Sequence, residues 1–222
     1  MVQFAHNHFF VKEETKERED LLDEEELTKL LDEIFSFGTD NDSKIKTHSD
    51  QMLNITPDTG IFLSILIQAT SASRVLEIGT SNGYSTIWIA DALSRGVTGG
   101  TVATIEVSKK KFEMAKENFE KSGLSRFIEP HLADVRSYLK EEVKDESIDF
   151  VFLDAERSQY ISYWSDIDRV LKTNGLLVVD NALSPKPEEL IDFFTLVKQS
   201  HRYLMQTLQI GKGEMIGLKQ EK

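Results

Sequence analysis

One stretch decides the fold of this protein: Arg74-Val-Leu-Glu-Ile-Gly-Thr-Ser-Asn-Gly-Tyr-Ser-Thr86. It opens as a short apolar run, which is typical of a buried strand, and passes through two glycines into a helical pattern over 85–93. Thr101–Glu106 repeats the arrangement, ahead of a helix over 109–122 that Gly123 is expected to end. Strands that alternate with helices in this way predict a parallel sheet covered on both faces.

Three more apolar runs continue the alternation, over 127–132, 148–153 and 176–179. The end of the chain differs, because 203–210 and 214–218 flank Gly211-Lys-Gly213 and predict a hairpin, hence an antiparallel edge. The whole chain, 1–222, is therefore expected to be a single α/β domain with a doubly wound sheet. Its expected parts are an N-terminal helical segment, 1–60, and a core, 61–222.

The N-terminal segment begins with polar residues 1–20, which are expected to form a tail or a loose first helix. A helical pattern starts at Leu21 and is expected to end at Gly38 and the polar residues after it. A second helix is expected to begin near Pro57. The residues of this second helix that are expected to face inward are Ile61, Phe62, Ile65 and Leu66.

Composition excludes several classes of protein. Among the 222 residues there is no cysteine, which excludes disulfide scaffolds, thiolate zinc sites, iron–sulfur clusters and thiol nucleophiles. The 26 Lys and Arg against 38 Asp and Glu give a net charge of −12, which argues against a large nucleic-acid surface. No stretch approaches the roughly 18 to 20 apolar residues of a membrane helix, and the first residues lack a secretory pattern. The expected location is the cytoplasm.

A ligand site is expected where the first two strands end. Gly79 and Gly83 would let the backbone approach a ligand, but Ser81 breaks the G-x-G-x-x-G spacing of a dinucleotide site. Glu106 lies roughly 20 residues past the last glycine, the offset at which an acid binds ribose hydroxyls. The combination fits an adenosine ligand without phosphates, such as S-adenosylmethionine, with Asp134 at its adenine end. The alternatives are that the two glycines form only a tight turn and that Glu106 is a solvated acid at the end of a strand.

Oxygen donors follow two later strands. Asp154 ends one apolar run, and Asp180 with Asn181 ends the next. Parallel strands bring their carboxyl ends to one rim of the sheet, so the three side chains are expected to converge. Carboxylate and amide oxygens suit Mg²⁺, or Mn²⁺ and Ca²⁺. The alternative is that one acid caps a helix and the other is exposed.

These motifs resemble those of the cation-dependent S-adenosylmethionine O-methyltransferases, the group of the catechol and caffeoyl-CoA O-methyltransferases and their bacterial relatives. The resemblance runs from about Met52 to the C-terminus. It is carried by the stretches Leu76-Glu-Ile-Gly-Thr-Ser-Asn-Gly-Tyr-Ser-Thr86, Thr104-Ile-Glu106, Phe152-Leu-Asp-Ala-Glu-Arg-Ser-Gln-Tyr160 and Val179-Asp-Asn-Ala-Leu183.

The resemblance implies a Rossmann-like methyltransferase sheet of seven strands, whose last strands are antiparallel, and a homodimer. It places a divalent metal on Asp154, Asp180 and Asn181, and it makes Asp154 part of the cofactor and catalytic sites as well. The further cofactor contacts that it implies, with Gly83 added from the glycine turn, are Met52, Glu77, Gly79, Ser85, Glu106 and Asp134.

One position departs from the family pattern. Members commonly carry a lysine three residues after the first metal aspartate, as the base that takes the substrate proton, and here that residue is Arg157. Arginine stays protonated, so the metal alone would have to lower the pKa of the acceptor hydroxyl. Arg157 is then expected to stabilise the oxyanion or to hold a substrate carboxylate. The alternative is an exposed cation at the start of a helix, paired with Glu156 or with a neighbour.

The predicted activity is methyl transfer to a small acceptor, a vicinal diol or a phenol. Three alternatives remain at this point. In the first, the acceptor is a hydroxylated tRNA base, which the net charge disfavours. In the second, the chain is a module that binds S-adenosylmethionine with little catalysis, as the missing lysine allows. The third is a nicotinamide oxidoreductase, against which the glycine spacing counts.

Overall fold

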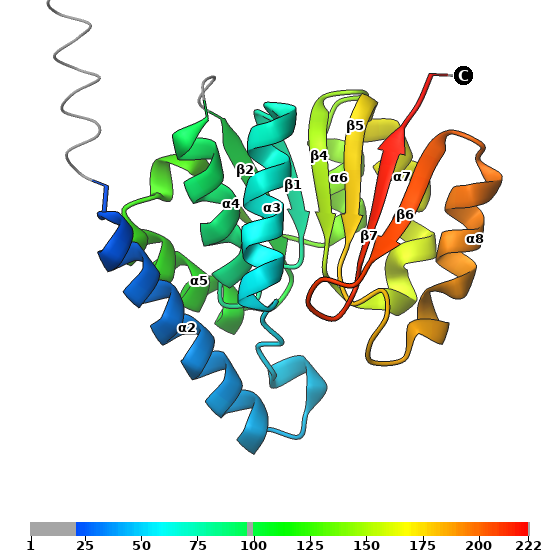
Figure 1. The fold of residues 1–222 in the computed structure, drawn as a ribbon. Helices are drawn as coiled ribbons and strands as arrows, with labels where there is room; N and C mark the ends of the chain where they lie inside the picture. The colour runs from blue at the N-terminus through cyan, green and yellow to red at the C-terminus, as the bar shows by residue number, and fades with distance from the viewer. Residues whose placement is uncertain (1–20, 97–99, 222) are drawn as a thin grey trace, which may run out of the picture.

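The protein is built on a seven-stranded sheet of order β3-β2-β1-β4-β5-β7-β6 (Figure 1). The computed structural model describes residues 21–96 and 100–221. The expected tail or helix over 1–20 lies outside these residues. The strands β1 to β5 pair in parallel, β7 pairs antiparallel with β5, and β6 pairs antiparallel with β7, which confirms the predicted fold with its antiparallel C-terminal edge. The strands are β1 (Arg74–Ile78), β2 (Thr101–Glu106), β3 (Ile128–Leu132), β4 (Ile148–Leu153), β5 (Leu171–Val179), β6 (Tyr203–Leu208) and β7 (Glu214–Lys219).

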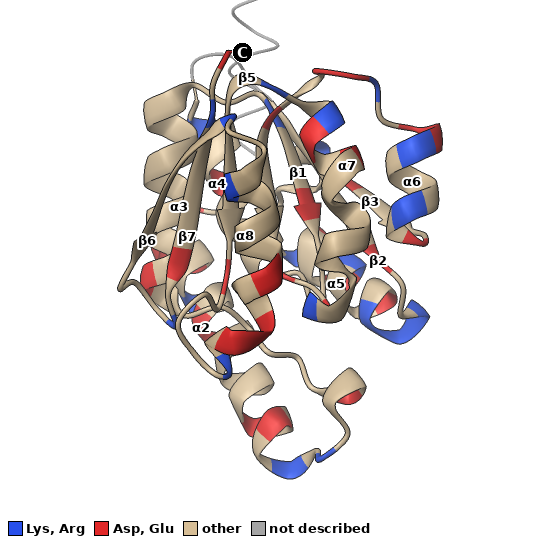
Figure 2. Ribbon diagram, turned by 90° about the vertical axis from the view of Figure 1, so that its right-hand side faces the viewer, with Lys and Arg blue, Asp and Glu red and all other residues tan. Residues whose placement is uncertain are grey.

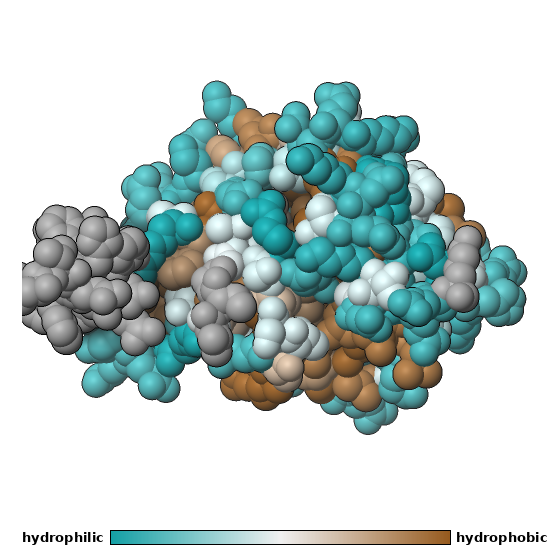
Figure 3. All heavy atoms as spheres, turned by 90° about the horizontal axis from the view of Figure 1, so that it is seen from above, coloured by the Kyte–Doolittle hydropathy of each residue, from teal (hydrophilic) through white to brown (hydrophobic). Residues whose placement is uncertain are grey.

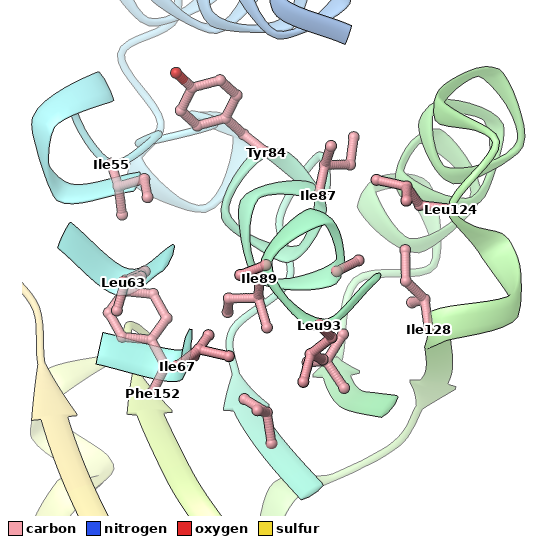
Figure 4. Close-up of a cluster of buried hydrophobic side chains, with 14 of the residues drawn as sticks. Ile55, Leu63, Ile67, Tyr84, Ile87, Ile89, Leu93, Leu124, Ile128 and Phe152 are labelled. Carbon is pink, nitrogen blue, oxygen red and sulfur yellow. The ribbon is translucent and has the colours of Figure 1, made fainter. Parts of the chain in front are cut away.

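Helices cover both faces of the sheet, as Figure 1 shows. Successive strand residues alternate between two cores: Phe150 and Phe152 face one, and Val151 and Leu153 face the other. The first core joins the sheet to α3, α4 and α5, and Figure 4 shows its apolar side chains between α3, α4 and the strands. The second joins it to α6, α7 and α8. These helices are α3 (Pro57–Thr70), α4 (Tyr84–Arg95), α5 (Lys109–Ser122), α6 (Val135–Glu141), α7 (Tyr160–Val170) and α8 (Ile191–Gln199).

The first described helix, α2 (Glu24–Lys44), differs from the expectation at its end. It starts with a capping box formed by Asp23 and Glu26, and it runs through Gly38 for a further turn and a half. Gly38 is a contact residue, because a Cβ there would lie 2.5 Å from the side-chain amide of Asn54. The prediction that Gly38 ends the helix was therefore wrong. This glycine lies inside the helix and makes room for the segment of the same chain that carries Asn54.

The second helix, α3, begins at Pro57 as predicted, and of its predicted inward residues Leu66 packs against the core and Phe62 is half-buried, but the prediction for Ile61 and Ile65 was wrong. Leu63 and Ile67 are buried, whereas Ile61 and Ile65 are exposed. Gly60 brings α3 against α4, since a Cβ there would meet the ring of Trp88 at 2.6 Å. The helix is apolar nearly all round, so hydrophobic periodicity does not choose its buried side.

The order of the strands reverses between β1 and β4, and the carboxyl ends of these two strands point to the same end of the molecule. In sheets of this kind, ligands bind in the crevice at such a reversal. Within the part of the chain that the structure describes, no helix combines the length and the apolar character needed to cross a membrane.

Candidate active site

A cavity of about 300 Å³ opens beyond the carboxyl ends of β1 and β2. That volume is at the lower end of the range for sites that bind small molecules. Five of the residues predicted from the sequence lie together in its wall. They are Met52, Gly79, Ser85, Glu106 and Asp154.

Gly79 closes the cavity where β1 meets β4. Its φ angle is 104°, and a Cβ atom there would lie 1.9 Å from the main-chain oxygen of Asp154. Only glycine fits this close approach of two backbones. Gly83 also has a positive φ, 86°, and precedes α4, but its neighbour is the ring of Phe119 and it is not part of the cavity wall.

Glu106 is held by two main-chain amides. The Ser81 amide donates to Oε2 at 2.9 Å, and the Ser108 amide donates to Oε1 at 2.7 Å. The carboxylate is buried except at the cavity, and each of its oxygens keeps a lone pair for a further donor. It is therefore free to accept hydrogen bonds from a donor in the cavity, and its binding of ribose hydroxyls stays a prediction.

The Met52 side of the cavity is positioned by residues that the sequence did not single out. Asp42, in the last turns of α2, accepts from the amides of Met52 at 2.6 Å and Leu53 at 2.8 Å. On the other side, the hydroxyl of Ser81 donates to the Met52 carbonyl at 2.6 Å. Asp42 lies in the polar run that was interpreted as the end of a helix, and no sequence signal distinguishes it there.

Glu77 is fully buried behind the cavity wall. Its carboxylate accepts hydrogen bonds from the hydroxyls of Ser85 at 2.6 Å, Thr104 at 2.6 Å, and Thr86. Burial raises its pKa from 4.5 to about 7, against the opposing effect of these hydroxyls. Glu77 thus anchors Ser85, which does line the cavity. A direct contact of Glu77 with a cofactor stays a prediction.

Asp134 lies outside the cavity wall. It is exposed, and it caps α6 by accepting from the Ser137 amide at 3.1 Å. The neighbouring residue, Val135, lines the cavity instead. The predicted role of Asp134 at the adenine end of the cofactor stays a prediction.

The three predicted metal ligands come together where β4 and β5 end. The amide nitrogen of Asn181 lies 3.4 Å from Oδ1 of Asp154, and it also donates to the carboxylate of Asp180. Burial raises the pKa of Asp154 well above its ordinary value, and the charges of Asp180 and Glu77 raise it further. Among residues 21–96 and 100–221, no three His, Cys, Asp or Glu side chains are arranged as a ready-made metal site.

Arg157 contacts the loop that follows β5. Its guanidinium donates to the carbonyls of Pro185 at 2.6 Å, Lys186 at 3.2 Å and Asn181 at 3.3 Å. It also lies 3.5 Å from the carboxylate of Glu189. Its side chain is only 14% exposed, so it is not the exposed cation of the alternative interpretation. The structure shows a residue that holds the loop in place, and the predicted catalytic role stays a prediction.

A doubly wound sheet with an antiparallel last hairpin and a cavity at its strand reversal defines the Rossmann-like methyltransferase fold. The crystal structure of the O-methyltransferase from Bacillus cereus in complex with SAH has this architecture. It superposes with a TM-score of 0.71 over 86% of this chain and 91% of that chain, at 26% identity.

Sequence comparison leads to the same group. The sequence model of the O-methyltransferase family matches residues 29–187, more than half of the chain. Catechol O-methyltransferase of Niastella koreensis is 31% identical over 133 residues, which are 59% of this chain and 59% of that protein. Caffeoyl-CoA O-methyltransferase 1 of Zea mays is 31% identical over 140 residues, 61% of this chain and 53% of that protein. The matched stretches span less than two thirds of the length of these curated relatives. The chain belongs to the O-methyltransferase family.

Proposed function

We propose that this protein transfers the methyl group of S-adenosylmethionine to an oxygen of a small vicinal diol or phenol, that it uses a divalent cation, and that it works in the cytoplasm. The observation that carries the proposal is the shared cavity wall of Gly79, Glu106 and Asp154. The glycine turn at Gly79 and the hydrogen-bond acceptor Glu106 suit an adenosine. Both line the same cavity as Asp154, the first residue of the Asp154–Asp180–Asn181 cluster.

The oxygen cluster fits a hard divalent cation. Two carboxylates and one amide supply anionic and neutral oxygen donors, and the half-buried Asp154 lies beside the charges of Asp180 and Glu77, which makes its ionised form costly without a cation. The amide of Asn181 has its nitrogen toward the carboxylates, and a half-turn of the amide group would present its oxygen instead. A cation bound here would supply positive charge that lowers the pKa of an acceptor hydroxyl.

This chain's own residues then position the reactants. Glu106 holds a ribose, Gly79 allows the cofactor to approach the backbone, and the Met52 segment closes the side of the cavity. In the transfer, the acceptor oxygen forms a bond to the methyl carbon, the sulfur–methyl bond breaks with its electron pair staying on sulfur, and the hydroxyl proton passes to water. Holding two reactants in line accounts for much of the acceleration in such displacements.

The experiment that tests this proposal is a transfer assay with labelled cofactor against catechols, hydroxycinnamoyl thioesters and undermethylated tRNA. Each acceptor is assayed with Mg²⁺ and with EDTA. We expect label in a phenolic acceptor, lost in EDTA. Transfer to tRNA alone would contradict the small acceptor, and transfer that survives EDTA would contradict the use of a cation. Binding of the cofactor without any transfer would indicate a module without catalysis.

We also propose that the protein is a homodimer, as the family resemblance implies. Ile61 and Ile65 of α3 and Leu204 of β6 are 50%, 58% and 64% exposed. Figure 3 shows hydrophobic, brown surface gathered along the edge of the molecule that carries α3 and the β6–β7 hairpin. Exposed apolar patches of this kind are typical of interaction surfaces. Light scattering on the wild type and on Ile65→Asp should show a dimer that the substitution weakens.

A further inference from the structure

Glu214 is an acidic residue that the proposed function does not yet use. It is the first residue of β7 and is 0% exposed. In the antiparallel pairing of β5 with β7, Val179 lies across from Met215, so Asp180 lies across from Glu214. Directly opposed residues have their Cβ atoms about 4.5 to 5.5 Å apart. In Figure 2, β7 carries a red, acidic segment inside the sheet. The strand pairing therefore brings this carboxyl beside a predicted metal ligand.

One oxygen of this carboxyl is satisfied and the other is not. The hydroxyl of Thr59, also fully buried, donates to Oε1 at 3.0 Å. Oε2 is buried and has no hydrogen-bond partner. An unsatisfied buried oxygen is costly, so such an atom commonly marks a place where another group binds.

The surroundings of Glu214 are strongly acidic. Asp180 lies across from Glu214, and Asp154 follows β4, the strand on the other side of β5. Within residues 21–96 and 100–221, none of the ion pairs includes Asp154, Asp180 or Glu214. Lys212 is the cation that acts on Asp154, from the β6–β7 turn. Like charges opposite one another in a buried position are unfavourable unless a positive charge lies between them.

We propose that Glu214 is a third acidic residue of the cation centre of Asp154, Asp180 and Asn181, and that its charge raises the affinity of this centre for a divalent cation. The proposal rests on the proposed cation dependence. Glu214 lies across from Asp180 and its Oε2 has no hydrogen-bond partner, and hard divalent cations bind more tightly as the number of carboxylates around them rises. Asp154 and Asp180 give the centre two negative charges, and the amide of Asn181 is neutral. Glu214 provides a third negative charge.

The test is Mn²⁺ binding in the absence of acceptor, followed by electron paramagnetic resonance of the free ion. Glu214→Gln keeps the shape of the side chain and the acceptor oxygen for Thr59 while removing the charge. We expect Mn²⁺ to bind at least about tenfold more weakly to this variant, with the affinity for S-adenosylmethionine unchanged. Glu113→Gln, at an exposed position of α5, is the matched control and should bind Mn²⁺ as the wild type does.

Three further variants separate the possible failures. If Asp180→Asn binds Mn²⁺ weakly but Glu214→Gln binds it as the wild type does, Glu214 only supports the hairpin and this inference is overturned. If Asp154→Asn and Asp180→Asn both bind Mn²⁺ as the wild type does, the cation dependence itself is wrong. Glu214→Asp keeps the charge and should bind Mn²⁺ more tightly than Glu214→Gln; equal affinities would show that charge at this position has no role.

Discussion

The backbone of Gly79 lies directly against the backbone of Asp154, because a Cβ atom on Gly79 would be 1.9 Å from the Asp154 carbonyl oxygen. The contact continues the pairing of β1 with β4, since the amide of Asp154 donates to the carbonyl of Ile78 at 3.0 Å. It joins the turn that is suited to the cofactor to the first acid of the oxygen cluster. Any displacement of one therefore moves the other.

We expect Gly79→Ala to destabilise the protein by about 3 kcal/mol or more. A positive φ for alanine and the overlap with Asp154 each cost about 1 to 3 kcal/mol. Gly96→Ala is the matched control, because Gly96 has a φ of −70° and its nearest neighbour would lie 3.3 Å away. Urea unfolding of both variants measures the difference. Equal midpoints for the two would contradict the close contact.

Glu106→Ala is expected to weaken the binding of S-adenosylmethionine by at least about tenfold, which is ~1.4 kcal/mol. A hydrogen bond to a charged group contributes ~1.5 to 3 kcal/mol, and the two main-chain amides hold this carboxylate in position for such bonds. Calorimetry gives the affinity, and circular dichroism shows that the variant is folded. Asp134→Ala, outside the cavity wall, serves as the comparison, and a larger loss there than at Glu106 would reverse the assignment.

Arg157→Ala is expected to loosen the loop over 181–189. The variant loses hydrogen bonds to three carbonyls, one of them that of Asn181, and we expect the free energy of unfolding to fall by about 1 to 3 kcal/mol. Transfer should slow while the cofactor affinity stays unchanged. Arg157→Lys should recover only part of the loss, because an ammonium lacks the planar donor pattern of arginine.

Limited proteolysis of the loop and urea unfolding measure this effect. Arg95→Ala removes an exposed helical ion pair with Asp91 and should change stability by less than about 0.5 kcal/mol. If Arg157→Ala resembles Arg95→Ala in both measurements, Arg157 does not hold the loop.

The buried carboxyl of Glu77 predicts a dependence of stability on pH. Its pKa rises from 4.5 to about 7 on folding, so the folded state prefers the neutral acid. The stability that Glu77 contributes is complete below pH 4.5 and is lost as the pH rises through 7. Glu77→Gln stays neutral, so its free energy of unfolding relative to the wild type should rise over this window, by up to about 3 kcal/mol. Urea unfolding in EDTA at several pH values tests this, and a difference that is flat with pH would contradict it.

The local pattern of residues determined most of the sheet and the positions of the site residues. Apolar runs such as 148–153 predict strands from their own residues alone, because a strand covered on both faces consists almost entirely of apolar residues. Glycine at 79 and acids at the ends of strands were visible for the same reason: parallel strands end on one rim, so residues that follow them meet there. The order of these features along the chain was enough to predict that Gly79 and Glu106 lie at one site and that Asp154, Asp180 and Asn181 come together.

The tertiary structure alone decided which faces and which distant residues meet. Gly60 of α3 fits against Trp88, and Gly38, inside α2, lies against Asn54. Asp42 reaches the Met52 backbone across a turn, and Glu214 faces Asp180 only through the register of β7 on β5. Helical and strand periods are properties of neighbouring residues. Contacts between residues far apart in the chain depend on packing and strand register, which no local period contains.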